Sequence, residues 1–523
     1  MAKPNPKKSV SMDDRIKELE QKRSSLMLGG GKERIEKQHK GGKLTARERI
    51  EGMVDPGSFQ ESGLFATHRA TLFGMAGKVL PADGVVTGSA AVGGRLVHLA
   101  SQDFTVGGGA AGEVHSIKIA ETMLESLKTG SPFIFINDSG GARVQEGIDS
   151  LSGYGKVFYT NTMLSGVVPQ ISLICGPCAG GAAYSPALTD FIIQTRQSQM
   201  FITGPNVIKQ VTGETVTADQ LGGPDSHMKL SGVTHLIAEN DQDAISLCRR
   251  LLSFLPNNNL EDPPMFPTDG NVDPNPELNK IVPTEAKQGY DVRLVITGIV
   301  DNADFLEIHS GFAPNIVVGF ARLLGRSIGI VANQPQYLAG ALDINASDKA
   351  SRFIRFCNAF NIPLITFVDV PGFLPGVQQE HGGIIRHGAK MLFAYSATTV
   401  PKITVILRKA YGGAFLAMCG KDLGADRVYA WPTAEVAVMG AEGAAEIVFR
   451  EEIEKSEDKA ARRKEVIEEY RNEFANPYVA AGRRLVDDVI NPMHSRKYLA
   501  QSLEALHAKR ELRPAKKHGL IPL

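Results

Sequence analysis

The amino-acid sequence predicts an α/β protein in which two similar domains follow one another along the chain. Strand-like and helix-like segments alternate within each half, which is typical of parallel strands packed against helices. A residue pattern in the first half returns in the second half at a nearly constant spacing. Between the halves, residues 257–278 are rich in Pro, Asn and Asp and have neither helical nor strand periodicity. We therefore divide the chain into domains 1–260 and 276–523.

Four matches in the same order carry the repeat. PQISLICGPCAGGAAY from Pro169 corresponds to PKITVILRKAYGGAFL from Pro401. The other three matches share a spacing that is one residue shorter than the spacing between Pro169 and Pro401. They are the Gly-Arg pairs at 94–95 and 325–326, Lys118 and Lys349, and Asp138 and Asp369. VDPGSFQE at Val54 also resembles VDNADFLE at Val300, at a larger spacing that requires insertions or deletions. Ordered matches at one spacing are hard to reach by chance, so they indicate an internal duplication.

The elements of the first half can be placed in order. RLVHLAS is predicted as a strand, residues 113–129 as a helix ended by Gly130, and FIFIND as the next strand. A helix is expected over much of residues 147–166, and QISLIC is expected as a further strand. Before the repeat, SMDDRIKELEQKRSSLMLGGG predicts an amphipathic helix capped by Ser11 and ended by Gly29. The charged residues 450–475 predict a helix with a solvated face.

Composition limits the possible function classes. Hydrophobic residues make up 43% and charged residues 22%, and 57 Lys+Arg balance 57 Asp+Glu. This balance gives no reason to expect nucleic-acid or membrane-surface binding, and no run of about 18 apolar residues predicts a membrane span. Five cysteines and the lack of a signal-peptide pattern predict a reducing cytoplasm. Cys175 and Cys178 form an isolated C-x2-C, which we interpret as buried thiols and not as a metal or redox site.

Two strand-to-turn sites end in Gly-Gly-Ala, at 180–182 and 412–414. Backbone N–H groups at such a turn, where a helix begins, can point at an oxyanion. Glycine is needed there because a side chain would block an approaching carbonyl oxygen. For a single Gly-Gly, close helix–strand packing is the favoured explanation. Two copies at equivalent places favour a pair of oxyanion holes, one in each domain.

Longer motifs carry a resemblance to a known family. They are DGVVTG at 83, SQDFTVGGGAAGE at 101, NDSGGARVQEGIDSLSGYG at 137, GPCAGGAAYSPALTDF at 176, VANQP at 331, VDVPGFLPGVQQEHGGIIRHGAKMLFAY at 368, RKAYGGAF at 408 and WPTAEVAVMGAEGA at 431, with EKQHKGGKLTARERI and PAKKHGLIPL near the two ends. With these motifs the chain resembles the family of propionyl-CoA carboxylase β subunits and methylmalonyl-CoA carboxyltransferases, the large subunits of transcarboxylase. The resemblance covers nearly the whole chain.

The resemblance implies two crotonase-like domains, with acyl-CoA on the first and biotin on the second. It implies a homohexamer in which each active site lies between the first domain of one subunit and the second domain of its dimer partner. The catalytic residues it implies are Gly180 and Gly181 for the thioester oxygen, and Gly413 and Ala414 for the ureido oxygen of biotin. The remaining implied residues are Gly140, Gly141, Ala142, Lys43 and Arg47 for acyl-CoA, Leu416 for the acyl pocket, and Gly372, Phe373 and Gly412 for biotin.

The same resemblance implies that no side chain acts as a general base. Asp138, Glu380 and His387 are therefore expected to make turn hydrogen bonds or ion pairs. Lys37, Lys43, Arg47 and Arg49 are candidates for CoA phosphates, with a solvated helix face as the alternative.

Biotin is expected on a separate carrier protein, with a biotin carboxylase subunit as a further partner. His227-Met228-Lys229 resembles a biotin attachment site, but that site needs a small β domain of its own, and Met228 lies inside the first repeat. No metal is expected, because no cysteine precedes Cys175 to form an N-terminal zinc ribbon.

Leu416 bears on the substrate. Several carboxylase relatives have Asp at the matching position, whereas Leu resembles the transcarboxylase large subunit or the α subunit of methylmalonyl-CoA decarboxylase. We expect carboxyl transfer between biotin and the propionyl-CoA/methylmalonyl-CoA pair, in either direction. Two alternatives from other classes are a crotonase-type hydratase or hydrolase, which needs a carboxylate beside the thioester, and a non-catalytic scaffold that binds CoA poorly.

Overall fold

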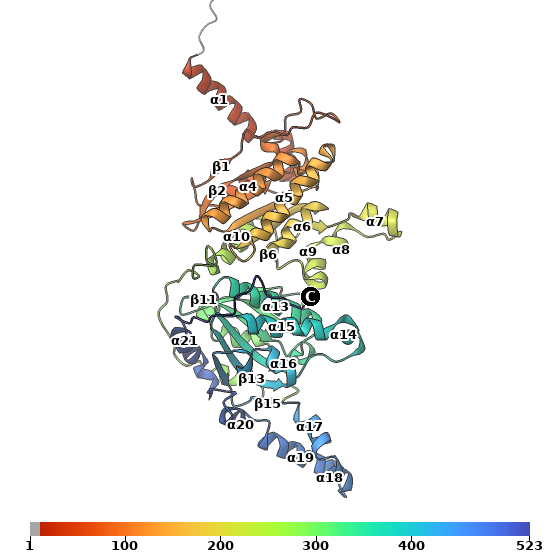
Figure 1. Ribbon diagram of the computed structural model, residues 1–523, viewed down its shortest axis with the longest axis vertical. Coiled ribbons are helices and arrows are strands. Elements are labelled where there is room, and N and C mark those ends of the chain that lie inside the picture. The colour runs from red at the N-terminus through yellow and green to blue at the C-terminus, as the bar shows by residue number, and fades with distance from the viewer. Residues whose placement is uncertain (1–10, 523) are drawn as a thin grey trace, which may run out of the picture. The chain divides into compact units, whose positions relative to one another are not determined.

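The computed structural model describes residues 11–522, and these residues form two compact units (Figure 1). Unit 1 contains the chain up to His227 together with Leu236–Arg250, and unit 2 contains Met228–His235 together with the chain from Leu251 onward. Residues 228–235 thus pack with the second unit, although the sequence repeat places them in the first. Each unit has one mixed eight-stranded sheet among the described residues.

The sheet of unit 1 has the strand order β1-β2-β3-β4-β5-β6-β8, with β7 beside β5. The first three strands pair antiparallel, and the strands from β3 to β8 pair parallel. The strands are β1 (Gln60–Ser62), β2 (Val85–Val92), β3 (Arg95–Gln102), β4 (Phe133–Ser139), β5 (Gln170–Ala179), β6 (Phe191–Thr195), β7 (Gln199–Phe201) and β8 (Leu236–Ala238). The helices are α1 (Met12–Met27), α2 (Lys32–Lys40), α3 (Ala46–Met53), α4 (Glu113–Thr129), α5 (Ile148–Leu164), α6 (Gly181–Leu188), α7 (Pro205–Thr212), α8 (Ala218–Gly222), α9 (Pro224–Ser226) and α10 (Asp241–Phe254).

The sheet of unit 2 repeats this topology as β16-β14-β13-β12-β11-β10-β9, with β15 beside β13. Its strands are β9 (Phe305–Ile308), β10 (Ile316–Leu323), β11 (Arg326–Asn333), β12 (Leu364–Val370), β13 (Lys402–Tyr411), β14 (Arg427–Ala430), β15 (Glu435–Ala437) and β16 (Asp488–Val489). Its helices are α11 (Leu278–Ile281), α12 (Val292–Thr297), α13 (Ile344–Ala359), α14 (Val377–Gly382), α15 (Ile384–Ala397), α16 (Gly412–Ala417), α17 (Ala441–Val448), α18 (Arg450–Lys455), α19 (Lys459–Glu473), α20 (Pro477–Gly482) and α21 (Ser495–Ala505).

Local signals in the sequence explain where several helices begin and end. Ser11 caps α1, and its hydroxyl and the Asp14 carboxylate form a reciprocal capping box. Gly130 ends α4 in the left-handed conformation that glycine adopts without strain. The helix predicted over residues 450–475 forms as α18 and α19, separated by a short break at 456–458.

The sequence repeat is also a repeat of contacts. Asp55 accepts hydrogen bonds from the N–H groups of Gly93 and Gly94, and Asp301 accepts the equivalent pair from Leu324 and Gly325. These aspartates therefore fix the tight turn of the β2–β3 hairpin in unit 1 and of the β10–β11 hairpin in unit 2. The match between the segments at Val54 and Val300, which has the larger spacing, is confirmed as a structural equivalence.

The two equivalent lysines have the same role in their units. Lys118 donates to the carbonyl oxygens of Ala82 and Val85, and Lys349 donates to four carbonyl oxygens of residues 309–316. Burial lowers the pKa of Lys349 to about 7 and that of Lys118 to about 8. Each lysine ties its helix to an irregular loop whose carbonyl groups would otherwise lack donors.

Apolar side chains from both sheet faces fill the cores. In unit 1, α4 and α5 pack side by side over the sheet (Figure 1), and Phe133, Phe135, Ile119 and Val157 meet there. In unit 2 the fully buried Trp431 lies in the core and donates from Nε1 to the hydroxyl of Ser495, at 2.9 Å. Cys175 and Cys178 are buried free thiols, as expected, and the other three cysteines are also free and buried. Among the described residues, no helix combines the length and apolar character needed to cross a bilayer.

Residues 228–235 join unit 2 through a stacked histidine pair. The imidazole rings of His235 and His309 have centroids 4.1 Å apart, and the His309 N–H donates to the His235 carbonyl at 2.9 Å. Burial lowers the pKa of His309 to about 3, and the positive charges of Lys349 and Arg352 act in the same direction. Burial also lowers the pKa of His235 well below its usual value. Both rings are therefore neutral in the folded protein at ordinary pH.

This pair makes the stability of unit 2 sensitive to acid. An unfolded histidine takes up a proton below about pH 6.5, whereas folded His309 stays neutral down to about pH 3. Stability therefore falls as pH decreases through this window, by about 1.4 kcal/mol per pH unit for each such histidine. His309→Phe keeps a ring in the stack but takes up no proton, so its free energy of unfolding is expected to fall less steeply with pH.

Urea unfolding followed by the fluorescence of Trp431, the single tryptophan of the chain, measures this slope in unit 2. His381→Gln, a change in an exposed histidine of α14, is the control and should keep the wild-type slope. Equal slopes for His309→Phe and the wild type would show that His309 is not held neutral.

Candidate active site

The first glycine turn joins β5 to α6. Gly180 has φ +60° and ψ −128°, a conformation that other residues rarely adopt, and its N–H donates to the carbonyl of Phe201 at 3.0 Å. Gly181 begins α6, so its N–H has no acceptor within that helix. A Cβ atom on Gly181 would lie 3.3 Å from the ring of Tyr154. Gly180 therefore shapes the turn, and Gly181 supplies the available donor.

The second glycine turn joins β13 to α16 in the same way. Gly412 has φ +59°, and Gly413 and Ala414 follow it in the first turn of α16. A Cβ atom on Gly413 would meet nothing within 4 Å. The space beside Gly413 is therefore open, whereas Ala414 is buried and Leu416, further along the helix, is partly exposed.

A second backbone segment lies beside each glycine turn. In unit 1 the N–H of Ala111 donates to the Gly141 carbonyl, the N–H of Arg143 donates to the Ala111 carbonyl, and Ala142 between them is exposed. A Cβ atom on Gly141 would lie 2.9 Å from the Ala179 oxygen, so this segment crosses directly against the end of β5.

Unit 2 repeats the arrangement with a larger side chain. The N–H of Leu342 donates to the Gly372 carbonyl, and the N–H of Leu374 donates to the Leu342 carbonyl. Phe373 thus takes the place that Ala142 has in unit 1. Its ring packs against Gly388 of α15, where a Cβ atom would lie 2.9 Å away. The apolar ring suits a flat apolar ligand better than the open segment of unit 1.

An irregularity in the strand ladder places both crossing segments. The register between β4 and β5 shifts between Asn137 and Ser139, and the register between β12 and β13 shifts between Val368 and Val370. A buried aspartate, Asp138 or Asp369, occupies each shift. Such an irregularity bends a strand and redirects the chain that follows. It therefore brings residues 139–143 and 370–374 across the ends of the neighbouring strands.

Asp138 is compensated by cations from α3 and from the loop that precedes it. Arg49 Nη2 lies 3.0 Å from its carboxylate and Lys43 Nζ lies 2.8 Å away, while Arg49 Nε also pairs with Asp241 at 2.8 Å. Arg49 is completely buried, so it is not available to CoA phosphates. Lys43 belongs to the same ion-pair group, and its side chain is 13% exposed. Arg47 makes a two-point ion pair with Glu61, at 2.8 and 2.9 Å.

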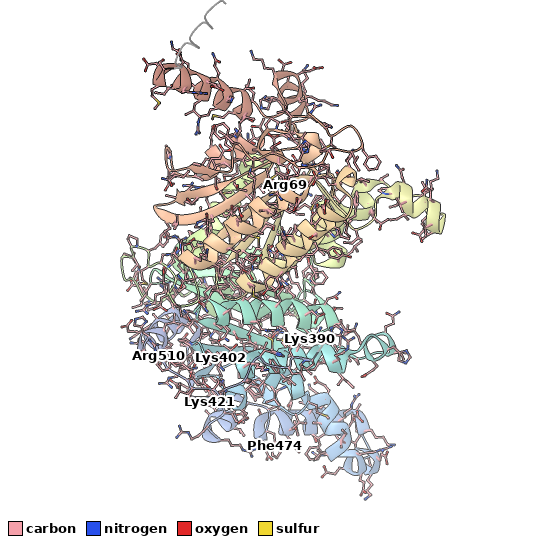
Figure 2. All side chains as sticks on the ribbon, turned by 45° about the horizontal axis from the view of Figure 1, so that its top comes forward. Arg69, Lys390, Lys402, Lys421, Phe474 and Arg510 are labelled. Carbon is pink, nitrogen blue, oxygen red and sulfur yellow. The ribbon has the colours of Figure 1, made fainter. Side chains whose placement is uncertain are left out.

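Asp369 receives its cation from a different direction. Arg408 Nε, on β13, lies 3.0 Å from its carboxylate, and the N–H of Lys409 donates to it at 3.1 Å. Burial raises the pKa of Asp369, although Arg408 and Lys409 oppose this rise. The ion-pairing role expected for Asp138 is present in both units. His387 likewise pairs with Asp348 at 2.8 Å, beside Lys390 of α15, which is labelled in Figure 2.

Two further groups beside the glycine turns were not predicted from the sequence. Lys409 is half-buried, and its ammonium makes no hydrogen bond or ion pair with another described residue. Burial lowers the pKa of Lys409. It stands shortly before Gly412, so it places a cation without a close partner near the end of β13. The signal was present as a charged residue in the otherwise apolar run PKITVILRKAYGG.

The other missed group is a clamp around Arg143. Arg143 is buried, and Nη1 donates to Asp83 at 2.6 Å and to Glu146 at 2.7 Å. Nη2 donates to the carbonyl oxygens of Ala110 and Asp83. The clamp therefore fixes Gly140–Ala142 beside the first glycine turn. In the described part of the chain, no three His, Cys, Asp or Glu side chains gather as metal ligands.

The chain matches known proteins over nearly its whole length. The sequence matches the carboxyl transferase domain family over residues 37–521. It is 62% identical over 518 residues to the methylmalonyl-CoA carboxyltransferase 12S subunit of Propionibacterium freudenreichii subsp. shermanii, with 99% of both chains covered. It is 57% identical over 511 residues to methylmalonyl-CoA decarboxylase subunit alpha of Propionigenium modestum, covering 97% of this chain and 99% of that one.

A solved structure shows the same fold. The crystal structure of transcarboxylase 12S with methylmalonyl-coenzyme A and methylmalonic acid bound has a TM-score of 0.97 and 62% sequence identity, covering 99% of this chain and 100% of that one. The predicted α/β fold with two crotonase-like halves is thus confirmed, and it is the fold of an enzyme family, with one glycine turn in each half. The chain belongs to the carboxyl transferase domain family.

The Arg143 clamp predicts a large loss of stability on substitution. Arg143→Met leaves the buried carboxylates of Asp83 and Glu146 without their cation, so the free energy of unfolding should fall by about 3 kcal/mol or more. Arg69→Met is the matched control, because Arg69 is exposed and lies 3.5 Å from Glu113 (Figure 2). Chemical denaturation should show a change below about 1 kcal/mol for the control. Similar losses in the free energy of unfolding for both variants would show that the buried ion pairs of Arg143 do not stabilise this segment.

Proposed function

We propose that this enzyme transfers a carboxyl group between biotin and a short acyl-CoA, with propionyl-CoA and methylmalonyl-CoA as the substrate pair. The observation that carries the proposal is the pair of equivalent glycine turns, one in each unit. Carboxyl transfer places negative charge on two oxygens, that of the thioester and that of the biotin ureido group. Two oxyanion-type turns in one chain match this requirement, whereas a hydratase needs only one.

In unit 1, the proposed role of the turn is to stabilise the thioester oxygen. The Gly181 N–H would donate to this oxygen as the α-carbon loses a substituent and the oxygen gains enolate charge. Gly180 would hold the turn, and the segment Gly140–Ala142 would contact the acyl-CoA from the other side. Lys43 and Arg47 remain candidates for CoA phosphates, although each already neutralises a carboxylate of its own unit.

In unit 2, we assign Gly412, Gly413 and Ala414, with Gly372 and Phe373, to biotin. The open space beside Gly413 and the apolar ring of Phe373 fit a flat ureido ring next to helix N–H groups. When bound, biotin supplies the carboxyl group as a carbamate. The chain's part is to hold the ureido oxygen at the start of α16, where the first-turn N–H groups favour negative charge.

The carboxylates of the site support a mechanism without a side-chain base. Asp138 and Asp369 are engaged by Arg49 and Arg408, and neither is free to remove a proton. This arrangement disfavours the hydratase alternative, which needs a carboxylate poised beside the thioester. Leu416 is partly exposed after the second turn, where its apolar side chain fits a short acyl group.

The names of the relatives support a proposal for the direction and the assembly. One relative is named a carboxyltransferase and another a decarboxylase, so decarboxylation of methylmalonyl-CoA is the alternative direction of the same chemistry. The transcarboxylase 12S structure is described as a hexamer assembly, and we propose a homohexamer here. Biotin would arrive on a separate carrier protein, supplied by a biotin carboxylase subunit or an equivalent donor. Met228 is buried in a short π-helical turn and not on a hairpin, which disfavours attachment there.

The direct test follows propionyl-CoA formation from methylmalonyl-CoA, with and without free biotin. Biotin-dependent product is expected, and Gly181→Val and Ala414→Pro should abolish it. Turnover that is indifferent to biotin would contradict the proposed mechanism.

A glycine pair provides a sharper comparison. Neither Gly413 nor Gly482 has a neighbour within 4 Å of an added Cβ atom or a positive φ angle, so both alanine variants should fold normally. Only Gly413→Ala places a methyl group where we assign the ureido oxygen. It should lower kcat/KM for biotin by about tenfold to a thousandfold, whereas Gly482→Ala should match the wild type. A Gly413→Ala enzyme with an unchanged kcat/KM for biotin would contradict the assignment of biotin to this turn.

Lys409 provides a second prediction for the same site. If its ammonium attracts the carboxyl group that is transferred, Lys409→Met should raise KM for methylmalonyl-CoA more than KM for propionyl-CoA in the reverse assay. Lys409→Arg should restore part of the difference, because the positive charge is retained. Steady-state kinetics in both directions measure the effect. Equal changes for the two acyl-CoA substrates would assign Lys409 a structural role only.

A further inference from the structure

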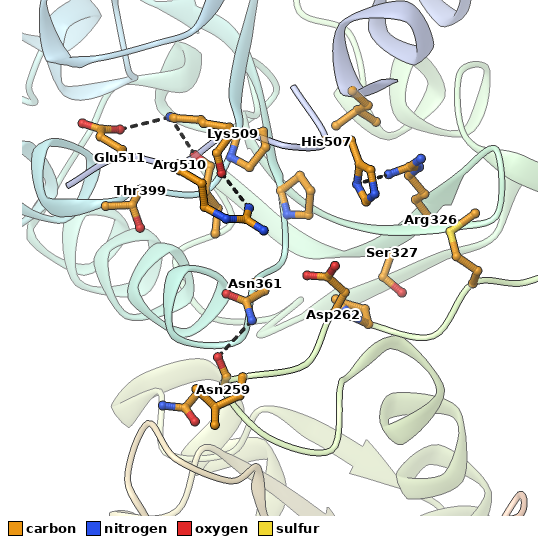
Figure 3. Close-up of a pocket in the computed structure, with 17 residues that line it drawn as sticks. Asn259, Asp262, Arg326, Ser327, Asn361, Thr399, His507, Lys509, Arg510 and Glu511 are labelled. Atoms are coloured by element: carbon orange, nitrogen blue, oxygen red, sulfur yellow. Dashed lines mark hydrogen bonds and ion pairs between the residues drawn. The ribbon is translucent and has the colours of Figure 1, made fainter. Parts of the chain in front are cut away.

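Unit 2 contains a pocket of about 570 Å³ that is separate from the glycine turn (Figure 3). It lies at the amino-terminal ends of β11, β12 and β13, between the linker 259–265 and the C-terminal residues 503–511. The glycine turn follows the opposite end of β13. The full length of β13, which has 10 residues, separates the two places, a distance of about 30 Å at the usual rise of a strand.

A buried hydroxyl group indicates that this pocket is built for a polar ligand. Ser327 is 2% exposed, lines the pocket, and has an Oγ atom with no hydrogen-bond partner among the described residues. Buried polar atoms are nearly always satisfied, so an unsatisfied one facing a cavity points to a partner inside it. The partner is either a ligand atom or a bound water molecule.

Charged groups enter the pocket from different segments. Arg510 donates from Nη1 to the Lys509 carbonyl at 2.9 Å and has no carboxylate partner in the described chain. Asp262, on the linker, lines the pocket and has no ion-pair partner among residues 11–522. In Figure 3 the Arg510 guanidinium and the Asp262 carboxylate extend toward the middle of the pocket. By contrast, Lys509 is already neutralised by Asp426 and Glu511, at 2.8 and 3.1 Å.

Part of the wall is apolar, and the linker beside it is held in place. Leu260, Val400, Pro401 and Leu503 line it. The side-chain amide of Asn361 donates to the carbonyl oxygens of Asn259 and Glu261, at 3.0 and 2.9 Å, which fixes the linker against the turn between α13 and β12. The pocket is therefore preformed, as small-molecule sites usually are.

We propose that this pocket binds a small organic anion that has an apolar body and one hydrogen-bond donor. The anionic group pairs with Arg510, the donor with Asp262, and a polar atom with the Ser327 hydroxyl. The Asp262 carboxylate repels multiply charged anions, which selects for a single negative charge. This site is independent of carboxyl transfer and lies outside the residues assigned to acyl-CoA and biotin.

Anilinonaphthalene sulfonate is a suitable probe because it combines aromatic rings, a secondary amine N–H and one sulfonate. We would titrate the assembled wild-type protein with this dye in saturating coenzyme A, which blocks dye binding at the acyl-CoA site. Fluorescence and calorimetry should show one coenzyme A-resistant site per chain. Arg510→Gln and Ser327→Ala should each weaken it, the arginine change by about tenfold or more.

Arg427→Gln is the matched control, because Arg427 also donates from Nη1 to a neighbouring carbonyl, that of Asp426, and lies outside the pocket. It should leave dye binding unchanged, and all three variants should keep carboxyl-transfer activity. The proposal is overturned if no coenzyme A-resistant site exists, or if Arg510→Gln and Ser327→Ala bind like the wild type. Binding seen only after dilution to dissociated chains would also overturn it, because a second copy would then fill the pocket. Normal dye binding in a protein without transfer activity would reject the proposed function and leave this site intact.

Discussion

A buried carboxylate at the end of a central strand is the constraint on which each unit depends. Asp138 and Asp369 occupy equivalent places in a register shift, and each must have a cation because an isolated buried charge is strongly unfavourable. Unit 2 supplies Arg408 from the adjacent strand. Unit 1 has Gly176 at the equivalent position, where even a Cβ atom would collide with the Asp138 carboxylate. Its cation comes instead from Arg49, so the N-terminal helices are required to complete the site.

This difference gives unlike surroundings to the glycine turns of two halves that share one topology. The ion pairs hold the crossing segments 139–143 and 370–374 against the glycine turns, so the turns are alike in backbone and differ in surroundings. Ala142 leaves the first turn open to an extended ligand, and Phe373 gives the second an apolar wall. One backbone solution thus has two different surroundings because the side chains around it diverged after duplication.

The sequence was informative wherever local pattern decides structure. Periodicity, glycine punctuation and the repeat predicted the sheets, the helix ends and the two turns, and the turns have equivalent φ angles in both units. The sequence was not informative where a partner far away along the chain determines the position of a side chain. Arg49 was predicted to meet CoA phosphates or to lie on a solvated helix face, yet Asp138 and Asp241, 89 and 192 residues away, draw it into the interior. Arg143 gave no local sign of its clamp, because Asp83 lies 60 residues earlier.

The division of the chain into units has a consequence for synthesis. The polypeptide leaves unit 1 after His227, contributes Met228–His235 to unit 2, returns for Leu236–Arg250 and then leaves again. Unit 1 cannot close until β8 and α10 have emerged, while His235 must wait for His309, which is made well after α10. The two halves are therefore interleaved during translation. A cut in the linker would not yield two self-sufficient fragments, because the second would lack residues 228–235.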